Sequence, residues 1–197
     1  MNDFPDLEEF FRKKENRFLE FVSRTHLDYL FSNENKADAE RIVRIYETHG
    51  LEILTFRDDN YPSLLRNIYD FPPILFLKGE NKLSYFAPIA VVGTRNPTEY
   101  GVRATEAFVQ NLAGKGISVV SGFALGIDSV AHSEALKNDI YTVAIVAGGV
   151  ESPYPARNRS LMDKILSKGG LFISEFAPGT DPFPYYFPMR KRIISGI

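Results

Sequence analysis

Residues 87–128 read APIAVVGTRNPTEYGVRATEAFVQNLAGKGISVVSGFALGID, and this stretch decides the fold. Two short apolar runs, at 88–92 and 117–120, are each followed by a glycine-containing turn and then by a helical pattern. Such alternation is typical of a parallel sheet whose faces are both covered. We therefore predict strands at these two runs and helices over residues 98–112 and 126–136.

The same alternation continues to the end of the chain. It predicts strands at 141–146 and 171–174 and a helix over 158–166. Before it, residues 57–82 contain Pro62 and Pro72-Pro73, which favour a connector with one short strand at 74–77. Residues 83–197 then form the main α/β domain.

The first third of the chain has helical periodicity. An apolar stripe runs from Leu7 to Val22, and a second helix is expected from Asn35 to the His49-Gly50 pair. We interpret residues 1–56 as a small helical N-terminal module that packs or forms dimer contacts.

Composition narrows the function. The 197 residues are 44% apolar and 24% charged, as in soluble globular proteins, and no apolar run reaches the ~20 residues of a membrane span. The start of the chain lacks the apolar core of a secretory signal, so we expect a cytoplasmic protein. The chain has no cysteine and its three histidines lie far apart in sequence, so we expect no metal site and no cofactor.

The net charge of −2 hides an asymmetry between the two parts of the chain. Residues 1–56 hold 8 Lys/Arg against 12 Asp/Glu, whereas residues 57–197 hold 15 against 13. The basic residues of the second part cluster locally, and such clusters are compatible with polyanion binding.

Three glycine-containing turns follow successive predicted strands, at residues 93–101, 121–128 and 147–155. Parallel strands place these turns along one edge of the sheet, where the next helix offers free amides and a positive dipole end. With arginines beside them, the turns predict an anion site. The strings G-x-x-x-x-G-K-[ST], G-x-G-x-x-G and G-x-S-x-G are absent from the sequence. A nucleophilic set of Ser121, Asp128 and His132 is an alternative, although Asp128 and His132 more simply order the helix start.

Basic and aromatic residues interleave near this edge. Tyr154 lies beside Arg157 and Arg159, and an aromatic run over 183–187 precedes Arg190-Lys191-Arg192. Single-stranded nucleic acid is held by such a combination, because cations follow the backbone while rings stack on bases. The alternative, a packing loop beside a solvated charged face, stays equally open on spacing alone.

Strings in family order over residues 61–197 resemble the DNA-processing protein A family, also called DprA or Smf. The matching strings are Tyr61-Pro62, Phe71-Pro72-Pro73-Ile74-Leu75-Phe76, Val91-Val92-Gly93-Thr94-Arg95, Tyr100-Gly101, Ser121-Gly122, Gly126-Ile127-Asp128, Ala131-His132, Tyr154-Pro155 with Asn158, Ile173-Ser174-Glu175, Phe187-Pro188-Met189-Arg190 and Arg192-Ile193-Ile194.

The resemblance implies a Rossmann-like, doubly wound, mainly parallel sheet that binds single-stranded DNA. It also implies that the protein protects incoming DNA and assists RecA loading in natural transformation and recombination. The family works as a homodimer and has no established enzymatic activity.

The resemblance also assigns site residues. Arg95 is expected to contact a phosphate, and the glycines of the turns are expected to turn their amides toward the DNA. Lys191 stands where the family usually has asparagine. The implied DNA-binding residues are Gly93, Thr94, Arg95, Ser121, Gly122, Gly126, Arg157, Asn158, Arg159, Arg190, Lys191 and Arg192. The candidates for base stacking are Phe123, Tyr154 and Tyr186.

Members of the family continue beyond the position of Ile197, so we expect a truncated product or a partner that covers the sheet edge. The alternative function is a nucleotide-binding or nucleotide-hydrolysing enzyme of the related phosphoribohydrolase-like class. The P-G-G-x-G-T-x-x-E string of that class is absent, and Glu175 is the carboxylate that would act as its acid or base.

Overall fold

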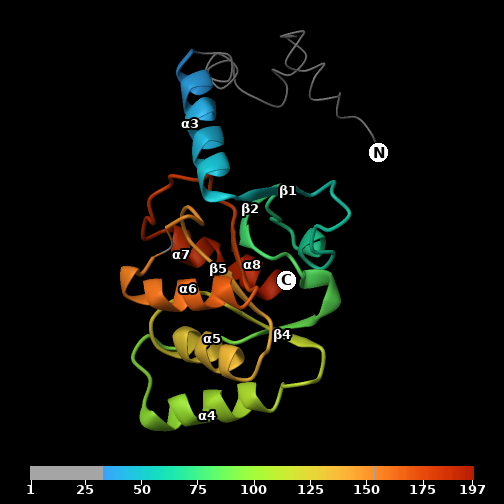
Figure 1. The fold of residues 1–197 in the computed structure, drawn as a ribbon, viewed down its shortest axis with the longest axis vertical. Helices are drawn as coiled ribbons and strands as arrows, with labels where there is room; N and C mark the ends of the chain where they lie inside the picture. The colour runs from blue at the N-terminus through green and yellow to red at the C-terminus, as the bar shows by residue number, and fades with distance from the viewer. Residues whose placement is uncertain (1–32, 153) are drawn as a thin grey trace. The chain divides into compact units, whose positions relative to one another are not determined.

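The computed structural model describes residues 33–197 except residue 153 (Figure 1). The chain divides into two compact units, residues 1–43 and 44–197. The predicted stripe from Leu7 to Val22 lies outside the described residues. The second predicted helix is present as α3 (Asn33–His49) and begins two residues earlier than expected. It ends at Gly50, whose φ of +59° favours glycine.

A six-stranded mixed sheet forms the centre of the second unit. Its order is β1-β2-β6-β5-β4-β3. The strands are β1 (Glu52–Thr55), β2 (Ile74–Gly79), β3 (Ala87–Ala90), β4 (Ile117–Ser121), β5 (Thr142–Ile145) and β6 (Leu171–Ser174). Strands β3 to β6 are parallel, β2 pairs antiparallel with β6, and β1 pairs antiparallel with β2. The predicted mixed α/β fold and its parallel strands are confirmed.

The sheet reaches further toward the N-terminus than the sequence predicted. Residues 52–55, placed in the helical module, form β1 instead, because Leu54 is buried in the core of the sheet. The predicted connector strand is present as β2, which pairs with β6 in the main sheet.

Side chains alternate between the two faces of the sheet, as the period of a strand requires. Leu171 and Ile173 of β6 belong to one buried cluster, whereas Phe172 between them belongs to another. The first cluster includes Leu65 of the 3-10 helix η2 (Leu65–Asn67) and Ile193 of α8 (Lys191–Gly196). These two short helices therefore cover one face.

The other face is covered by the helices that connect the parallel strands: α4 (Glu99–Gln110), α5 (Ile127–Lys137) and α6 (Arg159–Ser167). Helix α5 packs against both α4 and α6, so the three form one layer (Figure 1). The strand order advances in one direction from β3 to β6, and right-handed crossovers then place every helix on the same face. The second layer that a doubly wound sheet would carry is replaced by η2 and α8.

The three turns of interest follow the carboxyl ends of β3, β4 and β5 and lie along one edge of the sheet. The short helix α7 (Tyr186–Met189) and the start of α8 return to the same edge, where Arg190 contacts the end of β5. No helix of the described residues is long and apolar enough to cross a membrane.

Candidate functional site

Arg190 forms the buried floor of the site, with only 6% of the residue exposed. Its Nη1 donates a hydrogen bond to the carbonyl oxygen of Ile145 at the end of β5, at 3.2 Å. A Cβ placed on Gly122 would meet both Arg190 Nη2 and the Asp128 carboxylate, so these two charges converge where Gly122 has no side chain. Burial lowers the pKa of Arg190 to about 10, while the negative charge of Asp128 opposes that shift. The guanidinium therefore remains charged at neutral pH.

An exposed arginine lies beside this buried one. The guanidinium carbons of Arg95 and Arg190 lie 5.6 and 5.2 Å from the ring centroid of Phe187, within the range of cation–π interactions. Tyr154, which is 51% exposed, packs edge-to-face on the same ring at 5.7 Å. We call Arg95, Tyr154, Phe187 and Arg190 the arginine–aromatic cluster. Arg95 makes no ion pair within the described part of the chain, so its charge is available to an anion.

The glycines of the first two turns allow the turns to pack together. A Cβ on Gly126, whose φ is +82°, would clash with the backbone of Thr94 and Arg95. A Cβ on Gly93 would lie 2.6 Å from Ile127 Cγ1. The Ile127 amide donates to the carbonyl of Thr94 at 3.1 Å, so this helix amide is already used within the protein. That the glycine amides face DNA stays a prediction, whereas close packing is what the structure shows.

Two residues assigned to the site, Ser121 and Phe123, are fully buried in this structure. Ser121 donates from its hydroxyl to the carbonyl oxygen of Val91 at 2.6 Å and so joins the ends of β4 and β3. Phe123 is 0% exposed and packs edge-to-face on Phe172 at 4.9 Å, so it offers no ring face to a base. Both serve the core beneath the turns.

Asn158 is also buried, and it positions the second turn. Its Nδ2 donates to the carbonyl oxygen of Phe123 at 3.0 Å and to the Ser129 hydroxyl at 2.9 Å. Its neighbours Arg157 and Arg159 are exposed and have no ion pair within the described residues. These two cations therefore stay candidates for phosphate contacts. Asn158 instead holds the second turn in place through its buried hydrogen bonds.

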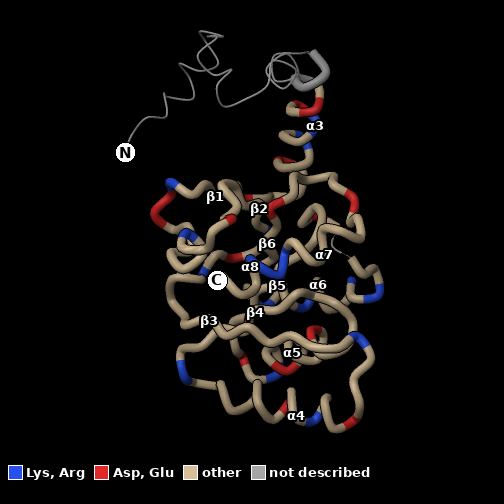
Figure 2. The backbone as a smooth tube through the Cα atoms, turned by 180° about the vertical axis from the view of Figure 1, so that it is seen from behind, with Lys and Arg blue, Asp and Glu red and all other residues tan. Residues whose placement is uncertain are grey.

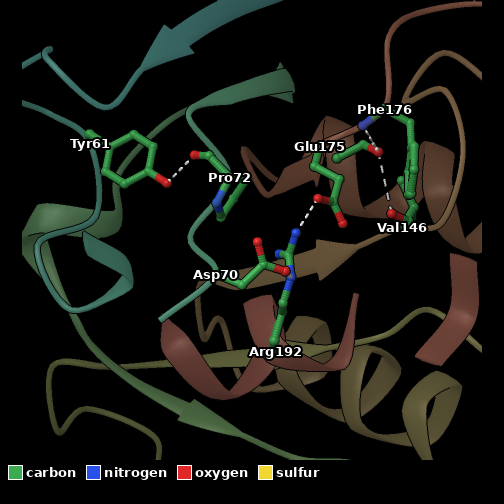
Figure 3. A network of polar contacts seen from close by, with 8 residues as sticks. Tyr61, Asp70, Pro72, Val146, Glu175, Phe176 and Arg192 are labelled. Atoms are coloured by element: carbon green, nitrogen blue, oxygen red, sulfur yellow. Dashed lines mark hydrogen bonds and ion pairs between the residues drawn. The ribbon is translucent and has the colours of Figure 1, made fainter. Parts of the chain in front are cut away.

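Arg192 differs from Arg190, although both belong to the same basic string. Its Nε donates to Asp70 Oδ2 at 2.9 Å, and its Nη2 pairs with the Glu175 carboxylate (Figure 3). Its charge is thus compensated by two acids, which leaves it less available to an anion than the unpaired charge of Arg95. The same pairing occupies Glu175, which the enzymatic alternative required as a free acid or base.

The remaining candidates, Tyr186, Lys191 and Thr94, differ in how exposed their side chains are. Tyr186 is half-buried and stacks against Phe176 with a centroid distance of 4.0 Å, which leaves it poorly placed to stack on a base. Lys191 is exposed, and Thr94 is exposed beside Arg95. Figure 2 shows Lys and Arg positions on the backbone beside the α8 label.

The nucleophilic alternative is not supported by the contacts. His132 is fully buried and its Nδ1 pairs with Thr142 Oγ1 at 2.8 Å, while the Ser121 hydroxyl bonds the Val91 carbonyl. Burial, together with the positive charge of Arg190, lowers the pKa of His132 to about 3. The histidine is therefore neutral and has no contact with Ser121. Among the residues that the structure describes, no group of three His, Cys, Asp or Glu could hold a metal ion.

Phe187 and Asp128 are members of the site that the residue patterns did not assign. Phe187 lies next to Arg190 in three dimensions and contacts Arg95, which is 92 positions away in sequence. The available signal was the Phe187-Pro188-Met189-Arg190 string, which joined a ring to a cation but did not show that a second arginine would share the ring.

The protein family described as DNA recombination-mediator protein A matches residues 52–197. The chain belongs to this family. It is 39% identical over 158 residues to DNA processing protein DprA of Bacillus subtilis, covering 80% of this chain and 53% of that protein. It is 41% identical over 140 residues to DprA of Streptococcus pneumoniae, covering 71% and 49%.

Two solved DprA structures are similar in fold. The Streptococcus pneumoniae structure has a TM-score of 0.69 and 34% identity, covering 91% of this chain and 56% of that chain. DNA processing protein A from Helicobacter pylori has a TM-score of 0.65 and 30% identity, covering 73% and 64%, and is described for its single-stranded DNA binding mode. This chain spans about half the length of the curated DprA relatives it matches.

Proposed function

We propose that this DprA-family protein binds single-stranded DNA at the arginine–aromatic cluster. The observation that carries the proposal is the pair of guanidiniums, one buried and one exposed, that share the ring of Phe187. The Helicobacter pylori relative, described for its single-stranded DNA binding mode, supports the same ligand.

The physical roles follow from exposure. Arg190 is held by Ile145 and cannot swing freely, so it provides a fixed positive charge at the floor. Arg95 is exposed and supplies a charge that reaches a phosphate from solvent. The exposed ring of Tyr154 offers a stacking surface, which all four bases can use. This arrangement favours a flexible strand with unstacked bases.

Fluorescence anisotropy of a labelled dT12 oligonucleotide, titrated at several salt concentrations, tests the proposal. Four exposed cations, Arg95, Arg157, Arg159 and Lys191, give an expected slope of about −3 in log affinity against log salt, from about −0.7 per phosphate contact. We expect Arg95→Ala to weaken binding by about tenfold. Lys115→Ala is the matched control, because Lys115 is exposed before the amino end of β4, at the opposite edge of the sheet. Binding that is absent at low salt, or that is equally reduced by both variants, would contradict the proposal.

We extend this proposal to the further roles that membership of the DprA family implies. We propose that the protein protects incoming single strands, assists RecA loading in transformation and recombination, and acts as a cytoplasmic homodimer without enzymatic activity. Family membership supports these roles. Co-purification of RecA with this chain in the presence of single-stranded DNA, and light scattering of the chain alone, test the two partners separately.

A further inference from the structure

A cavity of about 440 Å³ opens beside the arginine–aromatic cluster. Its volume lies in the range of pockets that hold small molecules, about 300–1,000 Å³. Tyr154 lines this cavity and also contacts Phe187, so the cavity and the cluster share one exposed ring.

Two walls of the cavity are tied to each other. Oε1 of Glu151, in the third turn, accepts a hydrogen bond from the amide of Gly179 at 2.8 Å. The amide of Gly149 donates to the carbonyl oxygen of Thr180 at 2.9 Å. These two hydrogen bonds thus hold the third turn and the segment after β6 together and fix the shape of the cavity between them.

The cavity is lined by charges of both signs. Glu151 carries a carboxylate that already accepts from the Gly179 amide, and four further charges line the cavity: the carboxylates of Asp163 and Asp181 and the cations of Lys78 and Arg159. None of these four side chains forms an ion pair within the described residues, although Asp163 and Arg159 are separated by one turn of α6. Met162 and Tyr154 add apolar and aromatic surface. A planar polar ring with both donors and acceptors on its edge matches this lining.

We propose that this cavity receives one unpaired base of the bound strand and favours bases with an exocyclic amino group over thymine. The inference rests on the proposed single-stranded DNA binding. A carboxylate accepts hydrogen bonds only, so it can accept from the amino group of cytosine, adenine or guanine. Thymine presents a carbonyl oxygen where cytosine presents its amino group, and that oxygen is repelled by a carboxylate. Lys78 and Arg159 are donors that can bond the O2 carbonyl oxygen, which cytosine and thymine both carry, and the Tyr154 ring can stack on either base, so these groups do not separate the two pyrimidines.

Paired titrations of dC12 and dT12 at neutral pH and equal salt test this inference, because the two oligonucleotides have the same length and phosphate charge. We expect the wild-type chain to bind dC12 about tenfold more tightly than dT12, the scale of one well-placed contact to a base edge. In the double variant Asp163→Asn/Asp181→Asn the acceptors become amides that also donate to a carbonyl, so the preference should vanish. Both aspartates are exposed, so this variant should keep the fold.

Asp59→Asn is the matched control, because Asp59 is an exposed carboxylate that does not line this cavity. It should keep the preference for dC12, whereas Tyr154→Leu should weaken both oligonucleotides by a similar factor. Equal binding of dC12 and dT12 by the wild-type chain would overturn the base preference and leave the proposed function intact. A preference that persists in the double aspartate variant would overturn its assignment to Asp163 and Asp181. Binding of neither oligonucleotide at low salt would overturn the proposed function and this inference together.

Discussion

Replacing Gly122 with alanine tests whether the buried arginine depends on the space above Gly122. The new Cβ would lie 2.8 Å from Asp128 Oδ2 and 2.9 Å from Arg190 Nη2, both closer than real Cβ contacts. Asp128 is 4% exposed and Arg190 is 6% exposed, so neither side chain can turn into solvent. Arg190 is also held by its bond to Ile145 and by the ring of Phe187.

The expected cost is that of overpacking a well-packed interior, about 1–3 kcal/mol of unfolding free energy. Relief requires Arg190 to leave the carbonyl of Ile145, which sacrifices a hydrogen bond from a charged donor worth about 1.5–3 kcal/mol. Either route displaces the guanidinium that we assign to the floor of the DNA site. Gly122→Ala should therefore lose stability and also weaken binding of dT12.

Urea unfolding followed by circular dichroism gives the stability, and anisotropy with dT12 gives the binding. Gly101→Ala is the matched control, because Gly101 lies in α4 and a Cβ there meets its nearest atom at 3.6 Å, an ordinary contact. Alanine is the better helix former, so this control should keep or raise the stability by up to about 1 kcal/mol. If Gly122→Ala unfolds at the same urea concentration as the wild type and binds dT12 equally, the tight packing around Arg190 does not exist.

Three further outcomes follow from buried contacts. Gly126→Ala should cost about 3 kcal/mol or more, measured by urea unfolding, because its Cβ meets rigid backbone and its φ of +82° disfavours any side chain. The pKa of His132 is lowered to about 3 by burial, below the ordinary 6.5 of the unfolded chain, so stability falls as the pH drops through that window; urea unfolding at several pH values should show a shallower slope for His132→Gln. Arg192→Met should cost about 3 kcal/mol because it leaves Glu175 half-buried without its partner, whereas Asp70→Asn should cost at most about 1 kcal/mol because Asp70 is exposed; comparable losses in thermal or urea unfolding would contradict this ranking.

The strands of the sheet could be predicted because their signal is local. The run at 171–174 has three apolar residues followed by Ser174, and all four are buried, so the prediction matches β6 at both ends. Strand β1 is four residues long and has one fully buried side chain, Leu54, so its periodicity is too short to separate it from the helical segment before it. Its place in the sheet is set by pairing with β2, which is a long-range contact.

For the candidate site, only its location at one edge of the sheet could be predicted from the sequence. Parallel strands place the three turns at one edge, and the contacts of Gly126 with Thr94 confirm that the first two turns meet there. Which residues face solvent depends on packing that the sequence does not show. Phe123 and Tyr154 are both aromatic residues of these turns, yet one ring is fully buried under α5 and α6 and the other is half exposed.

The basic string at 190–192 shows why charge patterns alone do not define a binding surface. The Arg190 amide donates to the carbonyl oxygen of Tyr186, and the Arg190 carbonyl oxygen accepts from the amide of Ile194. The string at 190–192 therefore lies on one continuous helical turn. Residues two apart on a helix point about 200° apart, because each residue rotates by about 100°. Arg190 therefore faces the end of β5 and the ring of Phe187, while Arg192 faces Glu175 and Asp70 on the opposite side. Arg190 thus lies buried beside Asp128 at the floor of the cluster, whereas Arg192 is paired with Glu175 and Asp70. Two arginines would lie on the same face of this helix only if they were three or four residues apart.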